Sequence, residues 1–413
     1  MKVRAMFAVA CAAVLLAFAT VAMAEDLEVL HWWTSGGESK AVGVLKEMVE
    51  KQGLEWKDFA VAGGAGSNAM KVLKARVVAG TPPAATQIKG VAIQEWAEQG
   101  VLVNIDPATK GWDKVVPPAV AKFLRYDGHY VAAPFWVHRM NWLYINKHDL
   151  DKVGGKPPTT WPEFFALADK FKAAGIIPLA HGGQPWQDLN LWEGVVLSKG
   201  QDFYTKAIME LDPAALTSDT MVDVFNTTRR ISTYFDPGHT GRSWNLSTAM
   251  VIDGKAAMQF MGDWAKGEFL KANMVAGKDY LCVTRPGTEG LFMFNSDSFM
   301  FFNEGGGKAT RGQIALAETI MSPRFQQEAA YYKGAIPVRS DVSVAKYDDC
   351  AKKSYADFQA ATKAGTLIPS LAHGMAQRDA TLGAIRDVVT QFVNSSEDAR
   401  TAVQKLAAAA KTN

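Results

Sequence analysis

Hydrophobic positions near the start of the chain follow the period of a strand and then the period of a helix. Residues 27–32 alternate as in a β-strand, a Gly-Gly pair follows, and apolar residues then recur with helical spacing over 41–49. Two more strands are predicted over 56–61 and 85–88, each followed by an apolar helical pattern. Such alternation predicts an α/β fold with a mostly parallel sheet and helices on both faces.

The pattern restarts after Pro134. An aromatic stretch over 135–144 precedes the capping box Thr160-Trp161-Pro162-Glu163, which predicts the start of a new helix. Further helical patterns occupy 372–392 and 399–410. The sequence contains no internal repeat and no long low-complexity linker, which favours lobes joined by short hinges.

The first 24 residues have the composition of an export signal. Lys2 and Arg4 precede the uncharged run 5–23, which ends in Ala22-Met23-Ala24 just before an acidic pair. A membrane anchor is the alternative, because the run is nearly long enough to span a bilayer. The A-x-A site favours cleavage after Ala24 by a Sec-type pathway.

Length and charge bound the class of protein. Removing these 24 residues from 413 leaves 389, which suits two domains better than one core. The chain has 44 basic and 42 acidic residues, and two of the basic residues lie in the leader, so the remainder is formally neutral. It therefore has no excess positive charge that would attract nucleic acid or an anionic membrane.

Two cysteines, Cys282 and Cys350, follow the leader. An exported chain matures where such a pair persists as a disulfide, and two buried thiols are the alternative. No CxxC motif is present, the seven histidines lack zinc-ligand spacing, and no nucleophile, Walker or dinucleotide motif is found. We predict neither a metal nor a cofactor.

Trp32, Trp33 and Glu38 form the first candidate site, at the end of the first predicted strand. Indole rings pack against the apolar face of a pyranose, and a carboxylate accepts hydrogen bonds from its hydroxyls. The structural alternatives are two core tryptophans on opposite faces of the sheet, and a glutamate that serves the N-terminus of a helix.

Other polar or aromatic residues are candidates with structural alternatives of their own. Trp264 follows a predicted helix and strand over 253–261 and has a core role as its alternative. Asp297 lies in Asn295-Ser296-Asp297-Ser298, between two apolar strand-like segments, and has a turn residue as its alternative. For Lys89 and His373 the alternative is a solvated surface position.

Paired carboxylates such as Glu38 and Asp297 would also serve glycoside hydrolysis. No acid is visibly placed in an apolar pocket that would raise its pKa, and no other catalytic motif is present. An exported hydrolase is therefore the competing class, and we predict that the protein is not an enzyme.

Several of these motifs resemble the extracellular sugar-binding proteins of ABC transporters, in the maltose-binding-like class. The resemblance spans essentially the whole chain after the leader. It is carried by His31-Trp32-Trp33 with Glu38, by the crossover 134–147, by the capping box at 160–163, and by 253–264. Within this class the chain looks most like periplasmic glucose/mannose-binding proteins, because the double tryptophan is a narrow feature.

The resemblance implies a set of sugar-binding residues and a partition of the chain. Eight positions match the family's binding residues: Trp32, Trp33, Glu38, Lys89, Trp264, Asp297, Lys333 and His373. The fold implied is a two-lobed, type II periplasmic binding protein. Its N-terminal lobe would comprise 25–134 and 295–333, and its C-terminal lobe 138–290 and 336–413, with hinges near 134–138, 290–295 and 333–336. Both cysteines would then lie in the second lobe and leave the hinge free.

The implied function is capture of a monosaccharide in the periplasm, with glucose favoured over mannose or galactose, for delivery to a membrane permease. A disaccharide or oligosaccharide receptor of the same class is the alternative, since a two-tryptophan platform has room for more than one ring. The resemblance also implies a monomer. Signalling through a chemoreceptor is a further role that leaves no mark in the sequence.

Overall fold

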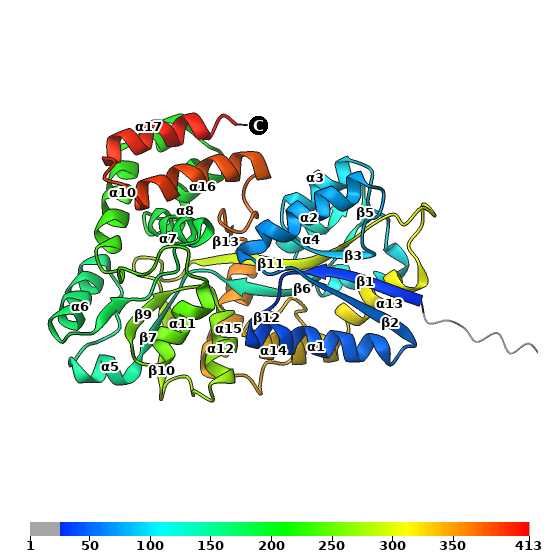
Figure 1. Ribbon diagram of the computed structural model, residues 1–413, viewed down its shortest axis with the longest axis horizontal. Coiled ribbons are helices and arrows are strands. Elements are labelled where there is room, and N and C mark those ends of the chain that lie inside the picture. The colour runs from blue at the N-terminus through cyan, green and yellow to red at the C-terminus, as the bar shows by residue number, and fades with distance from the viewer. Residues whose placement is uncertain (1–24, 413) are drawn as a thin grey trace, which may run out of the picture.

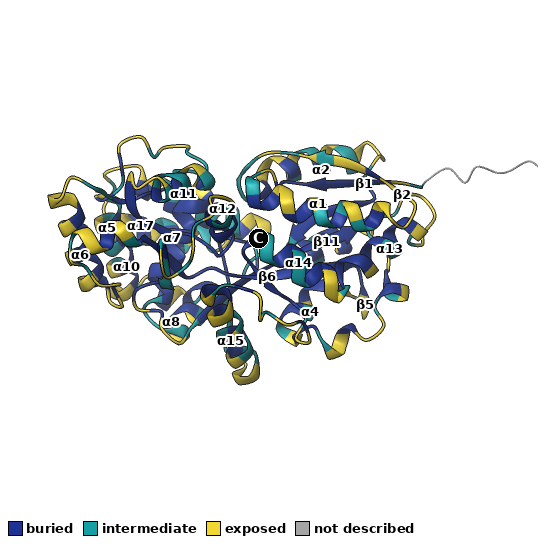
Figure 2. Ribbon diagram, turned by 90° about the horizontal axis from the view of Figure 1, so that it is seen from below, coloured by how far each residue is buried: buried dark blue, intermediate teal, exposed yellow. Residues whose placement is uncertain are grey.

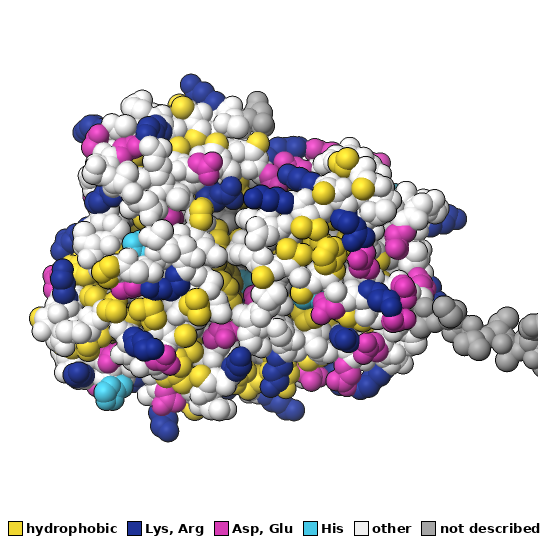
Figure 3. Space-filling view, viewed as in Figure 1, with side chains coloured by type: hydrophobic (Ala, Val, Ile, Leu, Met, Phe, Trp, Pro, Cys, Tyr) yellow, Lys and Arg dark blue, Asp and Glu magenta, His cyan; other side chains and the backbone are white. Residues whose placement is uncertain are grey.

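The computed structural model describes residues 25–412 as two lobes side by side (Figure 1). The predicted export signal lies outside the described residues. No helix in the described part of the chain is long and apolar enough to cross a membrane. Lysines and arginines are interspersed with acidic side chains over the face seen in Figure 3, in keeping with the neutral composition.

A seven-stranded sheet forms the centre of the first lobe, with strand order β12-β6-β11-β3-β1-β2 and β13 paired to β11. Its strands are β1 (Glu25–His31), β2 (Leu54–Ala60), β3 (Ala85–Lys89), β6 (Ala132–Arg139), β11 (Phe292–Phe301), β12 (Ile336–Pro337) and β13 (Leu367–Pro369). Helices α1 (Gly36–Glu50), α13 (Arg311–Ile320) and α14 (Pro323–Lys333) cover one face. Helices α2 (Ser67–Val78), α3 (Ala92–Glu98) and α4 (Pro118–Leu124) cover the other, beside the ribbon of β4 (Arg125–Tyr126) and β5 (His129–Tyr130).

The second lobe contains a four-stranded sheet of order β10-β7-β9-β8 and a larger share of helix. Its strands are β7 (Trp142–Asn146), β8 (Ile177–Leu179), β9 (Ala256–Phe260) and β10 (Tyr280–Thr284). Its helices are α5 (Lys147–Lys152), α6 (Trp161–Ala173), α7 (Pro185–Leu197), α8 (Gln201–Tyr204), α9 (Pro213–Leu216), α10 (Asp219–Ser232), α11 (Trp244–Ile252), α12 (Ala265–Lys271), α16 (Asp379–Val393) and α17 (Ala399–Ala409). The predicted capping box is present at the start of α6, where Thr160 accepts a bond from the Glu163 amide.

Each lobe has its own hydrophobic core, as the two dark interiors of Figure 2 show. The predicted α/β class and the two-lobed form are confirmed. The prediction of a mostly parallel sheet holds for the pairs β1–β2, β1–β3 and β11–β13 but is wrong for β3–β11, β6–β11 and β6–β12. Strand β11 runs antiparallel to both β3 and β6, because β6 leaves the large sheet towards the second lobe and β11 returns from that lobe.

The segment 291–302 also differs from its prediction. Instead of two strands around a polar turn, the chain forms the single buried strand β11, with an irregularity in its pairing between Asp297 and Ser298. The polar residues 295–298 are buried, and Asn295 and Asp297 border the cavity between the lobes. Asp297 is therefore not a turn residue.

A disulfide joins Cys282 of β10 to Cys350 at the start of α15 (Asp349–Ala364), with their Cα atoms 6.1 Å apart. Helix α15 contacts β11, β12 and β13 of the large sheet, and its Phe358 belongs to the large-sheet core. The bridge thus ties the small sheet to a helix that packs on the large sheet.

Candidate functional site

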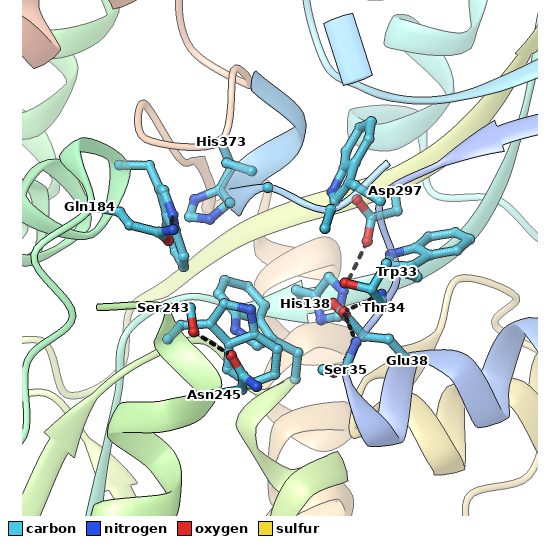
Figure 4. A pocket seen from close by; sticks show the side chains of 18 of the residues that line it. Trp33, Thr34, Ser35, Glu38, His138, Gln184, Ser243, Asn245, Asp297 and His373 are labelled. Atoms are coloured by element: carbon cyan, nitrogen blue, oxygen red, sulfur yellow. Dashed lines mark hydrogen bonds and ion pairs between the residues drawn. The ribbon is translucent and has the colours of Figure 1, made fainter. Parts of the chain in front are cut away.

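All eight residues singled out by the sequence line one cavity of about 450 Å³ between the lobes (Figure 4). The first lobe contributes the chain after β1, the start of α1, the end of β3 and the turn Gly63–Ala65. The second contributes residues at the starts of α7, α11 and α12 and in the loop after β13. Strands β6 and β11, which run between the lobes, supply His138, Asn295 and Asp297.

Trp32 and Trp33 have different surroundings. Trp33 is 2% exposed and packs against Phe135, Trp136 and Phe299 of the large core. Trp32 lies outside that core, with Lys89 Nζ 5.3 Å from its ring centroid. Both rings still border the cavity. The core interpretation describes Trp33, and the site interpretation describes Trp32 and the edge of Trp33 that faces the cavity.

Glu38 occupies the third position of α1, and its two oxygens have separate partners. Oε2 accepts hydrogen bonds from the amides of Thr34 and Ser35, both at 3.1 Å, which completes a capping box with Ser35. Oε1 lies 3.0 Å from Nζ of Lys333, at the end of α14. The pair places one negative and one positive group on the same side of the cavity.

Asp297 is held at the base of the cavity by groups from the neighbouring strand β6. Its Oδ2 accepts from Trp136 Nε1 at 3.0 Å and lies 3.1 Å from Nε2 of His138. Burial opposes the charged form, but the hydrogen bond and charge of His138, with Lys89 and Lys333, outweigh it and hold the pKa of Asp297 far below its usual range. Asp297 is therefore an ionised acceptor, and no bond to the described residues occupies its Oδ1.

His138 connects the two lobes through carboxylates. Its Nδ1 bonds to Asp263, which follows β9 of the second lobe, while Nε2 faces Asp297 of the large sheet. Burial disfavours the charged imidazole, but Asp263 and Asp297 overcome this and raise the pKa of His138. The resulting imidazolium fixes both carboxylates.

Lys89 and His373 are not solvated surface residues. Lys89 Nζ lies 3.4 Å from the carbonyl of Ala65, and burial lowers the pKa of Lys89. His373 is 4% exposed, and burial, assisted by the charge of Lys89, lowers its pKa well below the usual value. The imidazole of His373 is therefore neutral at neutral pH.

Trp264 begins α12 and forms an aromatic wall with residues that sequence reasoning missed. Its ring lies 6.1 Å from Trp186, 6.4 Å from Trp244 and 5.2 Å from His373. Trp186 and Trp244 each lie at the start of a helix, after Gln184-Pro185 and Ser243 respectively. They could have been predicted from the presence of an aromatic residue at the start of a helix, because the starts of α7 and α11 border the cavity.

Gln184, Ser243, Asn245, His138 and Asn295 are further polar lining residues that the sequence did not indicate. Figure 4 shows Gln184, Ser243 and Asn245 across the cavity from Glu38 and Asp297. His138 was hidden because the crossover strand is buried along its whole length, so its polar residue has no distinctive pattern. Among residues 25–412 no cluster of histidine, cysteine and acidic side chains suits a metal ion.

Comparisons with known proteins show the family of the chain. Residues 33–296 match the family described as bacterial extracellular solute-binding protein. A protein of Brucella suis named probable sugar-binding periplasmic protein is 50% identical over 414 residues, covering 99% of this chain and 98% of its own length.

Solved structures share the fold at low sequence identity. The solute receptor AcbH, described as exclusive for β-D-galactopyranose, superposes with a TM-score of 0.79 at 19% identity and covers 94% of this chain and 98% of its own. Maltose-bound MalE3 of T. maritima gives 0.78 at 16% identity, covering 94% and 99%. The chain belongs to the bacterial extracellular solute-binding protein family.

Proposed function

We propose that this protein is the periplasmic sugar-binding component of an ABC importer and that its ligand is a monosaccharide, glucose before mannose or galactose. The observation that carries the proposal is the convergence of eight residues, from both lobes and the strands between them, on one cavity. The name of the Brucella suis relative supports the sugar class, and the resemblance to glucose-binding proteins supports the choice of hexose.

The lining has the chemistry that a pyranose requires. Indole rings of Trp32, Trp186 and Trp264 offer surfaces for the apolar CH faces of the ring. Glu38 and Asp297 accept from hydroxyls, and Lys89 and Lys333 donate to them. The volume of about 450 Å³ equals about 15 water molecules at ~30 Å³ each, which is ample for one hexose with bridging waters.

Specificity would come from closure of the lobes over the sugar by hinge motion. Closure buries these polar groups, so a sugar that leaves one of them unpaired loses about 1 to 3 kcal/mol. The closed form would then dock on the permease and release its cargo. The hinges near 134–138, 290–295 and 333–336 are part of this proposal, while β12, α15 and β13 of the stretch 336–413 belong with the large sheet of the first lobe.

A larger saccharide is the second candidate, because a second compartment of about 580 Å³ adjoins the first. The two compartments share Trp32, Ala65, Lys89, Trp186 and His373 in their linings. A second ring could extend past Trp32 towards α2 and α16. The fold does not choose between the two candidates, since its solved examples include receptors for a monosaccharide and for maltose.

The geometry gives little support to glycoside hydrolysis by Glu38 and Asp297. A glycosidase needs one carboxyl that stays protonated to act as general acid. His138, Lys89 and Lys333 lower the pKa of Asp297 instead. Glu38 has both oxygens engaged by Lys333 and by the backbone at the start of α1.

Titration calorimetry with glucose, mannose, galactose, xylose and maltose tests the proposal. We expect the tightest binding for one of the hexoses and weaker binding for its epimers. Tighter binding of maltose than of every hexose would replace the first candidate with the second. A folded protein that binds none of these sugars, or one that releases sugar from glycosides, would contradict the proposal.

Single variants test the site itself. Asp297→Asn and Glu38→Gln should each weaken hexose binding by about 10- to 100-fold, because a charged acceptor is replaced by a group that also donates. Asp223→Asn is the matched control, since Asp223 is exposed and, among residues 25–412, its ion pair is with Lys199 on the surface. Unchanged affinity in either site variant would remove that residue from the site.

A further inference from the structure

The loop that carries His373 is fixed by one buried carboxylate. Glu193 of α7 is fully buried; its Oε1 lies 2.7 Å from Ser370 Oγ and its Oε2 accepts from the Ala372 amide at 3.1 Å. Tyr204 donates its hydroxyl to the carbonyl of Pro369 at 2.8 Å and accepts from the Leu371 amide at 3.2 Å. These bonds hold residues 369–372 immediately before the histidine.

Ser370 lies between the carboxylate and the imidazole. Its Oγ is 2.7 Å from Glu193 Oε1 and 3.1 Å from Nδ1 of His373. A serine hydroxyl has a single proton to donate. An ionised carboxylate is the stronger acceptor, so that proton points to Glu193 and the Ser370 oxygen is left to accept from His373.

This direction of bonding sets which ring nitrogen carries the proton. A neutral imidazole has one N–H donor and one acceptor nitrogen. If Nδ1 donates to Ser370, then Nε2 is the acceptor, and no bond to residues 25–412 occupies it. His373 lines the cavity between Trp186 and Trp264, at ring-centroid distances of 5.6 and 5.2 Å.

We propose that Ser370 and Glu193 are positioning residues that fix His373 as the Nδ1–H tautomer, so that its Nε2 accepts a hydrogen bond from a ligand hydroxyl. The ligand part of this inference rests on the proposed function. His373 then joins Glu38 and Asp297 as an acceptor, alongside the donors Lys89 and Lys333. A sugar whose hydroxyl at this place is O-methylated cannot donate and should be rejected.

The chain of hydrogen bonds from Glu193 through Ser370 to His373, called the relay below, requires an ionised Glu193. Burial raises the pKa of Glu193, and the bonds from Ala372 and Ser370, with the charge of Arg285, oppose that rise. The relay should therefore be tested at about pH 8, well above the ordinary range of a glutamic acid. Protonation of Glu193 at lower pH would free Ser370 to donate to Nδ1 and reverse the relay.

The experiment is ¹⁵N NMR of the histidine ring nitrogens in the ligand-free protein, with the His373 signals assigned by their loss in His373→Gln. In the wild type at about pH 8 we expect a protonated Nδ1 and an unprotonated Nε2. Ser370→Ala should move the ring towards the Nε2–H form, and Ser370→Thr, which keeps the hydroxyl, should restore the wild-type pattern. Ser370→Ala should also weaken hexose binding roughly tenfold, with Ser370→Thr close to wild type.

The wild-type spectrum alone decides the tautomer, so the test survives even if Ser370→Ala fails to fold. A wild-type His373 that carries its proton on Nε2 would overturn the inference, as would a folded Ser370→Ala protein with an unchanged tautomer. Absence of sugar binding by the wild type is a different result. It would overturn the proposed function and the ligand part of this inference, while the spectrum would still report the relay.

Discussion

Glu38 shows how one side chain at this site serves the fold and the cavity together. Its Oε2 completes the capping box of α1, and its Oε1 pairs with Lys333 beside the cavity. The two interpretations of this residue from sequence, a helix-terminal acid and a ligand acceptor, are compatible because a carboxylate has two oxygens. Replacement of Glu38 should therefore lower helix stability as well as ligand affinity.

His138 should make the stability of the protein depend on pH. Its folded pKa is raised, so its stabilising contribution is fully present below the unfolded value of about 6.5 and is lost as pH rises through the folded pKa. The folded pKa of Asp297 is lowered, so its contribution is present above about pH 3.9 and is lost as pH falls through the folded pKa. Both contributions are complete between about pH 4 and 6.5.

Replacing His138 with asparagine should remove the alkaline limb of this dependence. Because the change leaves Asp263 and Asp297 buried without their cation, we expect the free energy of unfolding to fall by about 3–5 kcal/mol near pH 5.5. The difference from wild type should shrink as pH rises above about 6.5. Urea unfolding at a series of pH values measures this difference in the free energy of unfolding, and His148→Asn is the control because His148 is exposed. A difference that stays constant across this range would show that His138 is not the titrating group.

The turn Gly63–Gly66 is the element of the first lobe that meets α7 of the second. Added to Gly64, a β-carbon would overlap Nε1 of Trp186 and Oε1 of Gln184. Gly64→Ala should therefore hinder closure and weaken sugar binding by about tenfold, since each 1.4 kcal/mol of steric cost lowers affinity by that factor. Calorimetry measures the effect. Wild-type affinity in this variant would mean that the turn and Trp186 do not meet in the ligand-bound form.

Gly43→Ala is the matched glycine control. Gly43 is exposed within α1, and nothing lies within 4 Å of an added β-carbon. This substitution should leave sugar affinity unchanged and raise stability by about 0.5–1 kcal/mol, because alanine loses less backbone freedom in a helix.

The disulfide between β10 and α15 should stabilise the fold mainly through the unfolded chain. It closes a loop with a sequence separation of 68 residues, for which the loop-entropy model gives an upper value of about 4 kcal/mol. Replacing both cysteines with serine should lower the free energy of unfolding by about 2–4 kcal/mol, as measured by urea denaturation. Hexose affinity should stay within about twofold, because neither cysteine borders the cavity. If the variant is as stable as wild type, the disulfide does not stabilise the fold, and α15 is held in place by its packing alone.

At the scale of the whole molecule, local pattern predicted the elements better than their pairing. The strands and helices of the first hundred residues follow from hydrophobic period and glycine breaks. The antiparallel direction of β11 did not, because strand direction depends on where a chain returns from the other lobe. Seven of the eight site residues were candidates from local pattern and Lys333 came from the resemblance alone, whereas Trp186 and His138 reach the cavity only through contacts distant in sequence.

The two lobes should open when no ligand is bound. In this structure the lobes meet at several points beside the cavity, including the Val91 amide on the Gly374 carbonyl at 2.9 Å and Arg378 on Glu98 at 2.6 Å. The exposed Arg378–Glu98 pair contributes about 0–1 kcal/mol and a single hydrogen bond about 0.5–1.5 kcal/mol, too little to hold the lobes together without ligand. Small-angle X-ray scattering should therefore give a larger radius of gyration for the ligand-free protein and a smaller one with saturating sugar. With sugar about tenfold above the wild-type Kd, Asp297→Asn should keep a larger radius of gyration than the wild type, because its affinity is weaker by about 10- to 100-fold. Equal radii with and without sugar would contradict closure by hinge motion, even for a protein that binds sugar tightly.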